Sequence, residues 1–81
     1  MPDPGRWDEA AILGALRRWV EHDLDRAVSS VQAGIYPEAE ARREFLALAL
    51  IRADMAQIDP ALATRLLSAM FDEAMADSSD A

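Results

Sequence analysis

The sequence predicts an all-α fold, a three-helix bundle with a long first helix, and two observations support this prediction. Apolar side chains recur at steps of three and four residues through most of the chain, which is the spacing of a helix with about 3.6 residues per turn. Glycine and proline stand only before and between these stretches, apart from an isolated Gly14. No useful length of sequence alternates apolar and polar residues as a strand does, so no sheet is expected.

The first helix is expected over about residues 6–33. Its apolar stripe comprises Ile12, Leu13, Leu16, Val20, Leu24, Ala27, Val28 and Val31. Gly34 suits the left-handed position just beyond a helix end, and Ile35 is placed for the hydrophobic contact that accompanies such a cap. A helix of this length would extend roughly 40 Å, so part of its stripe is expected to project beyond its own bundle. The alternative is a break near His22 and Asp23 that divides it into two shorter helices.

The second and third helices are expected over about residues 37–58 and 60–76. Pro37 suits the first position of the second helix, where Glu38 and Glu40 complement the positive end of the helix dipole. Asp59 as N-cap and Pro60 at the first position open the third helix. We therefore expect one helical domain over residues 1–76. A disordered acidic tail is expected over residues 77–81, where small and acidic side chains bury little surface.

The second helix contains an uninterrupted run of seven apolar residues, from Phe45 to Ile51. On a helical wheel its apolar residues form a bulky face of Ala41, Phe45, Leu48, Ile51, Met55 and Ile58, and a second, mostly small face of Leu46, Ala49, Leu50, Ala53 and Ala56. A helix that is apolar on nearly all sides is surrounded by other elements. The sequence predicts that a partner packs on the small face, because small side chains allow close approach. The alternative is that the first and third helices, splayed apart, cover both faces unaided.

A chain of 81 residues is near the size at which one hydrophobic core supplies only about 3–5 kcal/mol of net stability. Burial against a partner would add to this, and two-fold dimers are the commonest oligomers. We therefore expect a homodimer in which each long first helix covers the overhang of the other. The predicted partner interface comprises Trp7, Leu46, Ala49, Leu50, Ala53 and Ala56. Trp7 is included because tryptophan often dominates interface energy, although it could instead fold back over the end of the bundle.

The composition indicates an acidic surface, since the net charge is −7 and all eight basic residues are arginines. Such a charge opposes direct binding to nucleic acid and to anionic membranes. No apolar run reaches the roughly 18–20 residues of a membrane span, and no signal-peptide pattern is present at the N-terminus, so a cytoplasmic location is expected. The lack of cysteine excludes disulfides and thiolate metal sites.

The sequence carries no catalytic, metal-binding or nucleotide-binding signature. His22 and Asp25 are neighbours on a helix and could be drawn as a surface metal site, but Arg18 and Arg26 flank His22 at four residues on either side and oppose a cation. A solvated charged face is the better interpretation, so no metal and no cofactor are expected. The serines of the first helix are not spaced to face His22, and we expect no enzyme activity.

The paired arginines Arg42 and Arg43 raise the question of a helix-turn-helix that reads DNA with its second helix. The expected second helix has almost no polar outer face, and three glutamates surround the pair. Glu38 precedes Arg42 by four residues, which is the favourable order for an intrahelical ion pair. The arginines are explained without nucleic acid.

These observations predict a non-catalytic, acidic protein–protein interaction module: an adaptor, an assembly factor or an inhibitor of a partner protein, with a basic partner favoured by charge. The alternative is a nucleic-acid-mimicking inhibitor or antitoxin-like protein that blocks a basic groove of a DNA- or RNA-binding protein. This alternative is supported in part by carboxylates on the outer side of the first helix, Asp8, Glu21 and Asp25, and on the third helix, Asp72 and Asp77. Arg18 and Arg65 interrupt them.

Overall fold

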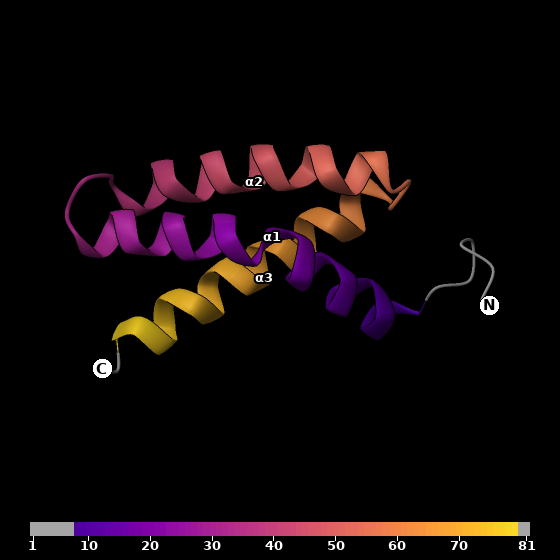
Figure 1. Cartoon of the computed structure of the whole chain (residues 1–81), viewed down its shortest axis with the longest axis horizontal. Helices are drawn as coiled ribbons and strands as arrows, with labels where there is room; N and C mark the ends of the chain where they lie inside the picture. The colour runs from indigo at the N-terminus through magenta and orange to yellow at the C-terminus, as the bar shows by residue number, and fades with distance from the viewer. Residues whose placement is uncertain (1–7, 80–81) are drawn as a thin grey trace.

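The computed structural model describes residues 8–79, which form three α-helices and no strand. Helix α1 spans Glu9–Gln32, α2 spans Glu38–Met55 and α3 spans Pro60–Ser79. Each helix packs against the other two. In Figure 1, α2 runs antiparallel to the second half of α1, and α3 crosses α1 diagonally. The prediction of an all-α fold with three packed helices is confirmed.

Helix α1 begins and ends with caps that the sequence encodes locally. The Asp8 carboxylate accepts a hydrogen bond of 2.7 Å from the Ala11 N–H, so the helix begins at Glu9, and the predicted residues 6 and 7 lie outside the described part of the chain. At the other end, Gly34 has a φ of 75° and the Ile35 N–H donates to the Ser30 carbonyl at 2.9 Å, as in a Schellman motif. The stop at Gly34 is confirmed, but Ile35 remains 68% exposed and does not bury the expected hydrophobic contact.

The predicted overhang of α1 is not found. The helix has 24 residues, which corresponds to about 36 Å, whereas the described part of the chain is 43 Å long. Its buried residues extend from Ile12 to Val28, so its own chain covers the stripe along most of its length. Figure 1 shows α1 bending between its indigo first half and its purple second half, yet the helix is continuous and does not divide at His22 and Asp23.

The junction between α2 and α3 is a second Schellman motif. Helix α2 ends at Met55, three residues before the predicted end, because Gln57 adopts a φ of 61° and the Ile58 N–H donates to the Ala53 carbonyl at 3.0 Å. The Asp59 carboxylate then accepts a hydrogen bond of 3.0 Å from the Leu62 N–H, and Pro60 opens α3 as predicted.

Helix α3 continues to Ser79, so the disordered tail predicted from residue 77 is wrong for residues 77–79. After Pro60 the sequence contains no further glycine or proline that would end the helix. Residues 80 and 81 lie outside the described part of the chain.

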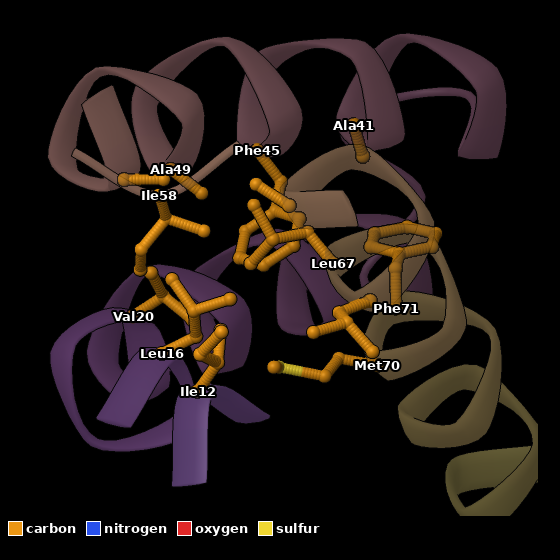
Figure 2. Packing of buried hydrophobic residues seen from close by; sticks show 13 residues of the cluster. Ile12, Leu16, Val20, Ala41, Phe45, Ala49, Ile58, Leu67, Met70 and Phe71 are labelled. Atoms are coloured by element: carbon orange, nitrogen blue, oxygen red, sulfur yellow. The ribbon is translucent and has the colours of Figure 1, made fainter. Parts of the chain in front are cut away.

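The core fills the space between the three helices (Figure 2). Its largest fully buried side chains are Phe45, Phe71, Leu16, Leu67 and Val20. The rings of Phe45 and Phe71 lie 6.0 Å apart between centroids, a favourable distance for an aromatic pair that joins α2 to α3. No polar or charged residue within residues 8–77 is buried, so apolar packing alone holds the centre together.

Candidate interaction surface

The small face of α2 lies inside the chain's own bundle. Ala49 and Ala53 are fully buried members of the core, and Figure 2 shows Ala49 beside Ile58 and above Val20. Small side chains at these positions allow α2 to approach its neighbours closely. We expected these two alanines to lie at the surface and to contact a partner. This expectation is wrong, because α1 and α3 of the same chain cover them.

The other predicted interface residues are spread over different environments. Leu46 and Leu50 are half-buried and pack against the edge of the core. Ala56 is exposed just beyond the end of α2. Trp7 lies outside the described residues. The structure therefore does not join the five described members of the predicted interface into one exposed patch, and any contact of the six residues with a partner stays a prediction.

The large apolar side chains that α2 leaves at the surface come from its bulky face. Leu48 is 55% exposed, Ile51 59% and Met55 81%, although the helical wheel had placed all three with the core residue Phe45. Glu40 and Glu44 precede them on the same side of the helix. The spacings of four, four, three and four residues put these five exposed side chains within about 80° of the helix circumference. We call these five residues the outer row of α2.

The outer row borders a hollowed surface on its α1 side. Glu44 and Leu48 line a groove whose other wall includes Asp23 and Arg26 of α1, with Tyr36 from the turn that connects the two helices. A second depression is lined by Met55 and Ala56 together with Arg52 and with Trp19 of α1, which is 39% exposed. The two hollows are linked by an ion pair of 3.6 Å between the Arg52 Nε and the Asp23 Oδ2.

Charges in the structure are only partly paired. Four ion pairs link different helices within the described residues: Arg17 with Glu73, Arg42 with Asp72, Arg52 with Asp23 and Arg65 with Glu9. The hydrogen bond to Asp72 raises the pKa of the Arg42 guanidinium, and the nearby Asp72 and Glu38 charges add to this rise. Glu40 and Glu44 take part in none of the four pairs, and the outer row itself contains no cation. The first half of the row therefore presents two exposed carboxylates that are in none of these ion pairs.

The structure gives no sign of a metal site in residues 8–79. His22 is exposed on α1, and no three or more histidine, aspartate or glutamate side chains in this range are grouped to hold a metal ion. None of the three described helices is both long and apolar enough to cross a membrane.

Compared with protein-family models, with curated proteins and with solved structures, the chain matches none of them. The case for a function therefore rests on the residues of the chain itself.

Proposed function

We propose that this chain is a small, acidic, non-catalytic protein–protein interaction module that acts as an adaptor, an assembly factor or an inhibitor of its partner. The observation that carries the proposal is the outer row of α2, where three large apolar side chains are exposed in one line. Single exposed apolar residues are common on protein surfaces, but neighbouring large ones are typical of binding sites.

The energetics favour this surface as the contact. Full burial of an aliphatic side chain contributes roughly 1.5–3 kcal/mol, and Leu48, Ile51 and Met55 each have more than half of their surface still to bury. Trp19 beside Met55 adds a residue type that often dominates interface energy. Because the core on the opposite side of α2 is already closed, a partner could cover the row without unpacking the bundle.

The test is capture of a partner from a lysate of the cells that produce the protein. The bait is the full chain, compared with a Leu48→Ser/Ile51→Ser/Met55→Ser variant and with Ile35→Ser as the matched control. Ile35 is an equally exposed apolar residue that lines neither hollow beside the row. Circular dichroism checks that all three baits are folded. We expect a protein that the wild type and the control retain and the triple variant loses. Retention of nothing specific by the wild type would refute the proposal.

The homodimer predicted from the sequence is a separate proposal. Two of its grounds are weakened, because Ala49 and Ala53 are buried and α1 does not overhang. Light scattering after size-exclusion chromatography, over a wide concentration range, measures the mass directly. A mass of twice the 8.9 kDa monomer would support the dimer, and a constant monomer mass would refute it.

A second candidate function, mimicry of a nucleic-acid backbone, is favoured by exposed carboxylates outside the four ion pairs. Two neighbouring carboxylates of this kind, Glu21 and Asp25, lie on α1, and two more, Glu40 and Glu44, lie on α2. Mimicry predicts that DNA or RNA competes for the captured partner and that amide substitutions at these carboxylates abolish capture. It also predicts that the Leu48, Ile51 and Met55 substitutions leave capture intact, which is the opposite of the first proposal.

A further inference from the structure

We infer that the outer row of α2 receives a basic amphipathic helix from another protein. Apolar side chains of that helix would pack on Leu48, Ile51 and Met55, and its lysines or arginines would meet Glu40 and Glu44. The inference rests on the proposed function and specifies the surface and the chemical class of the partner.

The order of residues along the row sets the pattern that a partner must match. The two carboxylates occupy the N-terminal half and the three apolar side chains occupy the C-terminal half. From Glu40 to Met55 the row extends about 22 Å along the helix axis. A helix of similar length can align with it and present anchors at steps of three and four residues, as in other helix-in-groove contacts. Its cations would lie at one end of its apolar stripe.

Charge complementarity selects a basic helix. Glu40 and Glu44 are four residues apart and repel each other weakly, and neither is in an ion pair of the described structure. Beside the row, Asp23 and Arg52 neutralise each other.

Three further charges lie near the row and do not change its sign. Arg26 lies across the groove from Glu44, on α1. Exposed Arg43 lies between Glu40 and Glu44 in the sequence and offsets part of their charge, while exposed Asp54 adds a negative charge beside Met55 at the other end of the row. The carboxylates at the start of the row are therefore the part of this surface that a basic ligand would complement.

A second copy of the chain fits this surface less well. Each copy carries a net charge of −7, so association is opposed by like charge. The row of the second copy also contains no cation to place against Glu40 or Glu44. The same net charge disfavours nucleic acid as the occupant.

The hollows beside the row provide the shape that a helix needs. A bulky side chain from the partner can enter the depression between Trp19 and Met55, while its neighbour one or two turns away can lie beside Leu48 and Tyr36. Trp19 would then be covered when the partner binds. Its fluorescence reports the event directly once the only other tryptophan, Trp7, is replaced by phenylalanine.

The experiment uses two synthetic amphipathic peptides of 18 residues, the length of α2. Both carry leucines at helical spacing; one has lysines at one end of the stripe and its twin has glutamates there. Binding to the Trp7→Phe chain is followed by Trp19 fluorescence and by NMR shifts of the labelled protein. We expect the basic peptide to bind at least about tenfold more tightly than the acidic twin, which corresponds to about 1.4 kcal/mol. The shifts should centre on the outer row and Trp19.

Two variants separate the apolar and the charged contributions. Leu48→Ser/Ile51→Ser should weaken binding of the basic peptide by about tenfold or more, because the substitutions remove apolar contact area. Glu40→Gln/Glu44→Gln should weaken it and also reduce the salt dependence of binding. The matched control is Glu21→Gln/Asp25→Asn on α1, which makes the same change in net charge away from the row and should leave binding unchanged.

Several outcomes would overturn the inference. Equal binding of the acidic twin, or shifts centred outside the row, would exclude a basic helix at this surface. A wild-type dimer that Leu48→Ser/Ile51→Ser dissociates would show that a second copy occupies the row. If capture from lysate depends on the row but the basic peptide does not bind, the proposed function stands and only the partner class is wrong. If nothing is captured and no peptide binds, both fail.

Discussion

The guanidinium carbon of Arg42 lies 5.0 Å from the centroid of the Phe71 ring, while the same side chain donates a hydrogen bond to Asp72. One residue of α2 therefore contacts two consecutive residues of α3, through a cation–π interaction and an ion pair. The sequence predicted Glu38 as the ion-pair partner of Arg42, but the recorded ion pair is with Asp72, 30 residues along the chain. Glu38 contributes only a longer-range attraction.

Replacing Arg42 by glutamine should lower the free energy of unfolding by about 1 kcal/mol. An exposed cation–π contact contributes about 0.5–1 kcal/mol, and an exposed ion pair such as this one contributes about 0.2–1 kcal/mol after screening by solvent. Urea unfolding measures the change. Arg43→Gln, at the exposed neighbouring position outside the recorded ion pairs, is the control and should stay within about 0.5 kcal/mol of the wild type. An equal loss in both variants would argue against the contact between α2 and α3.

Two leucines of opposite environment test the assignment of the core. Leu67 is fully buried, so Leu67→Ala should cost about 2–5 kcal/mol and leave a domain of this size largely unfolded at room temperature. Leu48→Ala removes the same atoms from the surface and should change stability by no more than about 0.5 kcal/mol. Thermal melts followed by circular dichroism compare the two. Equal loss of helical structure in the two variants would contradict the placement of Leu67 in the core and of Leu48 at the surface.

One residue after each of the first two helices adopts a left-handed conformation, Gly34 after α1 and Gln57 after α2. Introducing glycine at Gln57 and removing it at Gly34 should therefore have opposite effects on stability. Gln57 adopts a φ of 61°, which costs a residue with a side chain about 1–2 kcal/mol. Gln57→Gly should therefore stabilise the protein by a few tenths to about 1 kcal/mol, since greater freedom of the unfolded chain offsets part of the gain.

Gly34→Ala is the reverse of this change. No atom beyond the two adjacent residues lies within 4 Å of the added methyl carbon, so the expected loss of about 1 kcal/mol is a backbone effect. Urea unfolding of both variants measures whether Gln57→Gly raises and Gly34→Ala lowers the free energy of unfolding. Stabilisation of the protein by Gly34→Ala would show that the turn after α1 does not need the left-handed conformation.

The small face of α2 provides the last prediction. Ala53→Glu would place a carboxylate without a partner inside the core and should unfold the monomer, because the cost of burying a charge exceeds the stability of so small a domain. Ala47→Glu, on the exposed side of the same helix, should leave the circular dichroism spectrum and the melting temperature nearly unchanged. A folded Ala53→Glu protein would mean that this face is open, as the helical wheel had led us to expect.

The sequence by itself determined the helical class and several helix ends, because these depend on neighbours within one turn. Gly34 ends α1 since a left-handed residue is easiest for glycine, and Asp59 with Pro60 opens α3 through a cap and a preset φ. The end of α2 before Gln57 was not predicted, because Gln57 adopts the left-handed conformation although it is not a glycine. The end of α3 was missed because no local signal marks it.

Only the tertiary structure decided which face of α2 the chain covers for itself. A helical wheel shows that α2 has two apolar faces, but it contains no information on where α1 and α3 lie. The small side chains of Ala49 and Ala53 let the other helices come close, so this side became the core together with Ala41 and Phe45. Leu48, Ile51 and Met55 were left outside because residues 8–79 form no fourth helix that could cover them.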